Sequence, residues 1–287
     1  MEHTINWKKT LFGSIYAIAL LFIIGIPLNI LSGYLPIVAN IVVPTVLLPL
    51  LTFLGLKLVI EKWMKIPLKS LRFHPLKVNV TGLIFAILLP ILVITCYMFV
   101  PGTWVWADEF PVYAIICNIL FSGLAVGLTE EMIFRGVVMG LFEKKANLGI
   151  GIFVSSILFA LAHIITVSLN LVSFIQIVFS ITLVGCLLAL ICYFHNHFWN
   201  SALIHVVWNG LLLGFIHIGT EPDPNRAGTY ILDNRSPLVT GGEFGFETSA
   251  ITCAVYFLCI ILMIWMMKKR PRVENRYNEH NRRIEEL

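Results

Sequence analysis

Two adjacent glutamates and an arginine interrupt an apolar stretch of the sequence in the segment TEEMIFRG, residues 129–136. On a helix, Glu131 and Arg135 lie one turn apart and can form an ion pair. Glu130 is rotated by about 100° from Glu131 and cannot lie on the same line. We therefore expect Arg135 to neutralise one carboxylate and the other, Glu130, to remain without a partner and to be available as a general base.

Two further segments carry polar side chains that can join the same chemistry. The sequence FALAH places Phe159 and His163 on one face of a helix. The sequence HVVWN does the same for His205 and Asn209. Ionisable groups inside a membrane usually face the interior of the protein or a hydrated cavity, so each is a candidate for function.

The expected depths of these residues in the membrane favour their convergence. Glu130 precedes the basic turn EKKAN and His163 follows it by about the same number of residues, so antiparallel helices would bring both to roughly 20 Å from that turn. His205 and Asn209 would lie roughly 12 to 18 Å along their own helix from the same side. We expect one carboxylate, two imidazoles and one carboxamide to meet.

The composition indicates which elements must position these residues. The chain has 287 residues, of which 58% are hydrophobic and only 13% are charged, and its mean hydropathy is +0.88. These values are typical of a helical membrane protein and exclude an ordinary soluble domain. We expect an all-α fold: a polytopic transmembrane helical bundle forming a single integral membrane domain over residues 1–287. About eight apolar stretches are long enough to cross a bilayer: 11–31, 37–60, 80–100, 112–142, 148–167, 172–194, 198–218 and 250–267.

Basic residues predict the orientation of the bundle. They fall at alternate connections on one side of an eight-span arrangement, so the positive-inside rule predicts that both termini are cytoplasmic, with a cytoplasmic tail over 268–287. Acidic residues dominate the connection 220–248, which we expect to be an external loop, and its segment GGEFGFETS suggests no chemistry. The net charge of +4 therefore reflects topology and gives no reason to expect a nucleic-acid partner. The expected location is a cell membrane, as a multi-pass protein.

EEMIFR, FALAH and HVVWN resemble the EExxxR, FxxxH and HxxxN motifs of the CPBP family of intramembrane proteases, which includes CAAX prenyl proteases, bacteriocin-processing enzymes and Abi proteins. Each motif alone is weakly specific, but three in this order on separate predicted spans are more specific. The resemblance covers about residues 120–210, and we expect the catalytic-motif core within 112–210.

The resemblance implies a CAAX prenyl endopeptidase-like hydrolase. Glu130 and His163 would activate a water, and His205 with Asn209 would stabilise the oxyanion. Glu131 and Arg135 would form a structural ion pair, and Phe159 would support His163. The implied substrate is a membrane-associated protein or peptide, possibly lipid-modified, cut near the cytoplasmic leaflet.

The resemblance leaves the role of metal open, because the family was first classed as metalloproteases and is now described by a metal-free glutamate mechanism. A zinc ion could bind Glu130, His163 and His205 and keep one position for water. The sequence has no HExxH motif, and we expect that no cofactor is required, with Zn²⁺ as the alternative.

Two other functions fit the sequence. A non-proteolytic membrane regulator or a bacteriocin self-immunity protein could use the same fold, and its biological effect would survive substitution of Glu130. A transporter could use buried carboxylates and imidazoles as a proton path. No inverted repeat supports the transporter.

Overall fold

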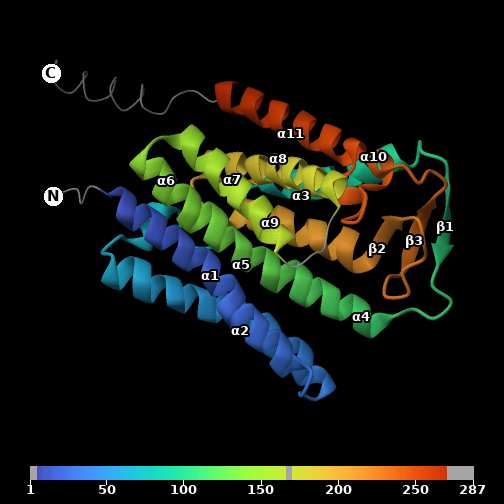
Figure 1. The fold of residues 1–287 in the computed structure, drawn as a ribbon, viewed down its shortest axis with the longest axis horizontal. Helices are drawn as coiled ribbons and strands as arrows, with labels where there is room; N and C mark the ends of the chain where they lie inside the picture. The colour runs from blue at the N-terminus through green and yellow to red at the C-terminus, as the bar shows by residue number, and fades with distance from the viewer. Residues whose placement is uncertain (1–4, 166–169, 270–287) are drawn as a thin grey trace.

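The computed structural model describes residues 5–165 and 170–269 as a bundle of helices capped at one end by a small β-sheet (Figure 1). The N-terminal half contains, in order, α1 Trp7–Ser32, α2 Ile37–Leu56, η1 Lys57–Trp63, η2 Leu68–Leu71, α3 Val80–Tyr97, β1 Gly102–Trp106, α4 Val112–Cys117, η3 Asn118–Val126, α5 Gly127–Glu131, η4 Met132–Val138 and α6 Met139–Lys145. The C-terminal half contains α7 Leu148–Ile164, α8 Leu171–His195, α9 Trp199–Trp208, η5 Asn209–Phe215, β2 Ile216–Gly219, β3 Gly228–Leu232, α10 Pro237–Thr240, η6 Phe246–Thr248 and α11 Ala250–Lys269.

Six helices in the described part of the chain are long and apolar enough to cross a membrane: Trp7–Ser32, Ile37–Trp63, Val80–Tyr97, Val112–Lys145, Leu171–His195 and Ala250–Lys269. The fifth and seventh expected spans are also helical but shorter. α7 has 17 residues, and α9 with η5 provides 10 and 7. The protein is thus a mostly helical membrane protein, and the expected count of about eight spans stays a prediction.

The two ends of the bundle differ. α1 begins, α11 ends and α6 turns into α7 at one end, whereas the three strands lie at the other (Figure 1). This arrangement puts both ends of the described chain on the same side of the bundle. Which side is cytoplasmic stays a prediction. Most of the tail expected over 268–287, and the last residues of the span expected over 148–167, lie outside the described residues.

The small sheet corrects the expectation of an all-α fold. β3 is its central strand and pairs antiparallel with β1 and parallel with β2. The seventh span was expected to continue to Ile218, but its helix ends at Phe215 and the next residues enter β2. The connection 220–248, expected as a loop, contains β3, α10 and η6. β1 pairs with a strand far along the chain, and β2 and β3 are near in sequence but parallel, so no local hairpin pattern could reveal the sheet.

The helix Val112–Lys145 crosses α9 and η5 at unusually close range. A side chain at Gly123 would place its Cβ 3.3 Å from both the Gly210 amide nitrogen and the Val206 carbonyl oxygen. Small residues at such a crossing let two membrane helices approach and gain van der Waals contact. The crossing lies next to Gly127, whose own Cβ position is 3.5 Å from the His205 ring. The glycines thus bring the glutamates of α5 to the histidine of α9.

The prediction from this crossing is that Gly123→Val lowers thermal stability. Its added methyl groups would meet backbone atoms, which cannot rotate away, and overpacking of this kind costs roughly 1–3 kcal/mol. The matched control is Gly25→Val, because a Cβ at Gly25 meets only a Leu48 methyl at 3.9 Å. The measurement is thermal unfolding of the purified proteins in detergent. Equal melting temperatures for the two variants would contradict the close crossing.

Candidate active site

Glu131 and Arg135 form an ion pair in the centre of the bundle. Arg135 Nη1 lies 3.0 Å from Glu131 Oε1, and the side chains are 1% and 0% exposed. Arg135 Nη2 also donates to the Gly185 carbonyl oxygen of α8 at 3.4 Å. Its guanidinium carbon lies 4.3 Å from the centre of the Phe159 ring. The arginine therefore touches α5, α7 and α8 at once.

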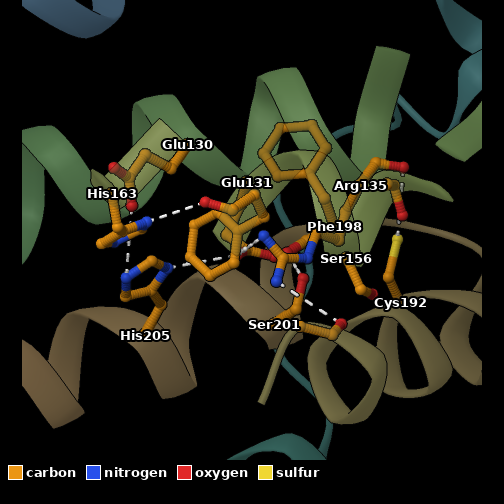
Figure 2. Close-up of polar contacts among 12 residues, drawn as sticks. Glu130, Glu131, Arg135, Ser156, His163, Cys192, Phe198, Ser201 and His205 are labelled. Atoms are coloured by element: carbon orange, nitrogen blue, oxygen red, sulfur yellow. Dashed lines mark hydrogen bonds and ion pairs between the residues drawn. The ribbon is translucent and has the colours of Figure 1, made fainter. Parts of the chain in front are cut away.

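His205 lies between the two adjacent glutamates (Figure 2). Its Nδ1 is 3.1 Å from Glu131 Oε1, and its Nε2 is 3.5 Å from Glu130 Oε2. Glu131 is paired with Arg135, and its ionised carboxylate can only accept hydrogen bonds. The proton between Glu131 and His205 is therefore on Nδ1 of His205. Glu130 Oε2 has no hydrogen-bond partner among the described residues, in line with the expectation, although α9 brings an imidazole to 3.5 Å from it.

His163 points toward Glu130 and His205 from the last turn of α7 (Figure 2). Its Nδ1 lies 2.8 Å from the Phe159 carbonyl oxygen. A carbonyl oxygen cannot donate, so Nδ1 must be protonated and donate in this contact. In the neutral imidazole the lone pair is then on Nε2. The Phe159 ring packs against the His163 ring with centroids 4.7 Å apart and holds the imidazole in place.

Asn209 follows His205 by one helical turn and lies at the start of the π-helical segment η5. Its Nδ2 donates to the Ser122 carbonyl oxygen of η3 at 2.9 Å. A carboxamide nitrogen has two hydrogens, so one remains for a second acceptor. π-Helical segments often occur at functional sites, and three of them, η3, η4 and η5, adjoin these residues. Their wider turns were not evident in the sequence pattern.

The four candidate residues share one cavity of about 120 Å³, which has room for several waters. Most of its wall is apolar. The lining consists of Leu89, Val126, Glu130, Phe159, His163, Ile181, Val184, Leu188, Ile204, His205, Trp208, Asn209, Leu213, Phe244, Glu247 and Tyr256. The cavity thus combines the carboxylate, both imidazoles and the carboxamide with an apolar surface.

The segment that follows the sheet in the sequence also lines the cavity, and none of the three motifs predicted it. Phe244 packs against His163 with ring centroids 6.1 Å apart. Glu247 accepts a hydrogen bond from Trp208 Nε1 at 2.5 Å. Burial raises the pKa of the Glu247 carboxyl, and the Glu130 carboxylate acts in the same direction. A glutamate inside the apolar surroundings of FGFETS was the available signal.

The zinc alternative names Glu130, His163 and His205 as ligands, and the structure shows how these side chains are engaged. Among residues 5–165 and 170–269, no three or more His, Cys, Asp or Glu side chains are arranged to hold a metal ion. His163 Nδ1 bonds to its own helix, and His205 Nδ1 lies 3.1 Å from Glu131 Oε1, so each imidazole has one nitrogen engaged outside the cavity. Whether a metal is required stays a prediction, as does the expectation that no cofactor is needed.

The comparison with protein families matches residues 112–211 to the family described as type II CAAX prenyl endopeptidase Rce1-like. Residues 112–211 form an Rce1-like domain. This domain supports the assignment to the CPBP family of membrane proteases. The match covers about a third of the chain and contains all three motifs, whereas Glu247 lies outside it. No curated protein and no solved structure matches the chain.

The buried ion pair leads to a stability prediction. Glu131→Gln should lower the folded yield and the melting temperature, because it leaves the Arg135 charge buried without a partner, at a cost of about 3–5 kcal/mol. The glutamine keeps an oxygen that can accept from His205, so the loss reports mainly the charge. The measurement is folded yield and thermal unfolding in detergent.

The exposed Glu109→Gln serves as the matched control and should behave like the parent. The double variant Glu131→Gln/Arg135→Gln should recover part of the loss, since it removes the unpaired charge. A double variant as unstable as Glu131→Gln, or less stable, would contradict the role of the pair.

Proposed function

We propose that this protein is an intramembrane endopeptidase that hydrolyses a peptide bond in a membrane-associated protein or peptide by a Glu/His-activated water. The observation that carries the proposal is the meeting of Glu130, His163, His205 and Asn209 in one cavity of a membrane bundle. The Rce1-like domain supports the same class of reaction.

Water activation is assigned to Glu130 and His163. A water in the cavity gives a proton to Glu130 as its oxygen attacks the substrate carbonyl carbon. His163 orients this water with the Nε2 lone pair, which is available because Nδ1 donates to the Phe159 carbonyl oxygen. The apolar wall excludes bulk water and strengthens each of these interactions.

Stabilisation of the tetrahedral intermediate is assigned to His205 and Asn209. The second Nδ2 hydrogen of Asn209 is available for the oxyanion, since the first is held by the Ser122 carbonyl oxygen. Glu131 holds His205 at Nδ1, which turns Nε2 toward Glu130. As an imidazolium, with Nδ1 held by Glu131 and a second proton on Nε2, His205 donates from Nε2 to the same oxyanion.

The substrate is proposed to reach the cavity from the cytoplasmic leaflet. His205 lies six residues and Asn209 ten residues from the first residue of α9, about 9 and 15 Å along the helix. α9 begins at the end of the bundle that carries the basic turns, which the positive-inside rule assigns to the cytoplasm. A lipid anchor on the substrate fits the apolar lining, and the substrate is proposed to be a membrane protein or peptide, with or without such an anchor.

The first functional prediction concerns the activated water. Glu130→Gln and His163→Ala should each lower cleavage by about 10²–10⁴-fold, because each removes a group that moves or positions a proton. The measurement compares the membrane proteomes of cells carrying the parent or Glu130→Gln, followed by cleavage of the accumulating protein by purified enzyme in liposomes. Glu109→Gln is the control and should cleave at the parent rate. Cleavage by Glu130→Gln at that rate would refute the assignment, and an intact biological effect without cleavage would favour a regulator.

The second functional prediction concerns metal. Exhaustive chelation should leave the cleavage rate unchanged, since the proposed steps use only side chains and water. The measurement is the rate of the purified protein before and after chelation, with Zn²⁺ added back in a third sample. A loss on chelation that Zn²⁺ restores would support the zinc alternative instead.

A further inference from the structure

The segment between α10 and α11 folds inward from the sheet and reaches the cavity. Gly241 and Gly245 have φ of 83° and 99°, and a Cβ on Gly241 would lie 1.7 Å from the Gly245 carbonyl oxygen. Thr248 Oγ1 donates to the Gly241 carbonyl oxygen at 2.6 Å and closes the turn. Only glycine fits this path of the backbone at Gly241.

Two bundle helices fix the backbone at Glu247. Ser180 Oγ of α8 donates to the Glu247 carbonyl oxygen at 2.6 Å. Thr252 Oγ1 of α11 donates to the Phe246 carbonyl oxygen at 2.8 Å. The position of Glu247 is therefore set by the bundle, and its side chain enters the cavity that also holds the catalytic candidates.

The Glu247 carboxyl accepts a hydrogen bond from a neighbouring side chain and also lines the cavity. Trp208 Nε1 donates to Oε1 at 2.5 Å, and the carboxyl lines the cavity together with Glu130, His163 and His205. Burial favours the protonated form of this carboxyl and outweighs the Trp208 hydrogen bond and the two imidazoles, which favour the charged form. The titratable groups that face it are His163 of α7, His205 of α9, Glu130 of α5 and Tyr256 of α11.

Hydrolysis of a peptide bond needs a proton donor as well as a base. The amine nitrogen is a poor leaving group until it receives a proton, and the Glu130 carboxylate is assigned to taking a proton from water. Two carboxyl groups whose surroundings favour opposite protonation states are a common basis for acid and base roles.

We propose that Glu247 is the general acid of this site and protonates the leaving nitrogen. The inference rests on the proposed function. The water oxygen bonds to the carbonyl carbon as Glu130 takes one water proton. The carbon–nitrogen bond then breaks as the Glu247 carboxyl gives its proton to the nitrogen. The proton on Glu130 passes through cavity water to the Glu247 carboxylate, and both groups regain their starting states.

The test compares an amide with an ester at the scissile bond of the peptide that the parent cleaves and Glu130→Gln does not. An ester leaves as an alcohol and depends far less on protonation. Glu247→Gln keeps an acceptor for Trp208 but has no acidic proton. It should lower the amide rate by about a hundredfold or more and the ester rate by less than about tenfold. Glu247→Asp should retain part of the amide activity, and Glu243→Gln, an exposed glutamate in the same segment, should match the parent.

The pH dependence adds a second readout. Burial raises the pKa of Glu247, so its acid form persists to higher pH than that of an exposed glutamate and is lost above the raised value. The parent amide rate should therefore fall on the alkaline side, and Glu247→Gln should lack this fall. A misfolded variant would lose the same fraction of its amide and ester cleavage rates, and its residual activity would keep the parent's pH profile.

Three results would overturn the inference alone: unchanged amide cleavage by Glu247→Gln, equal losses on amide and ester by a Glu247→Gln protein that unfolds at the parent's temperature, or an unchanged alkaline fall. Glu130→Gln should lose cleavage of both the amide and the ester. A parent protein without any Glu130-dependent cleavage would instead overturn the proposed function and, with it, the inference.

Discussion

The ion pair between Glu131 and Arg135 is the constraint that organises the pocket. Two charges in the interior of a membrane protein are tolerated only when they are matched, and here the match also fixes the surroundings. Glu131 holds Nδ1 of His205, and Arg135 lies over Phe159, whose ring contacts His163. One buried pair therefore aligns α5, α7 and α9. The chemistry of Glu130 depends on a neighbour whose own role is to keep the helices in register.

The glycines of the crossing complement this pair. Charge attraction sets which helices meet, and the missing side chains at Gly123 and Gly127 set how closely they meet. The sheet adds a third restraint, because β1 leads into the helix that carries the glutamates and β2 follows directly on η5. Both strands pair with β3, so the two site-bearing helices are joined at one end of the bundle as well as at the site.

The sequence predicted the helices well because a membrane requires long apolar stretches, and these are visible as composition. The pairing of Glu131 with Arg135 was also predictable, since it depends on spacing within one helix. The contact of His205 with Glu130 was not, because it depends on the distance between two helices. The pairing of β1 with β3 and the contact of Glu247 with the cavity were missed because both depend on segments that are distant in the sequence. For Glu247 the only local signal was a glutamate among the apolar residues of FGFETS.

The order in which the chain supplies the cavity has a consequence for biosynthesis. Glu130 comes first, then His163, His205 and Asn209, and the wall is completed last by Glu247 and Tyr256. A nascent chain that has not yet reached residue 256 lacks that side of the cavity wall. The cavity is therefore complete only after residue 256 has been made, when the helices that carry its other lining residues already exist.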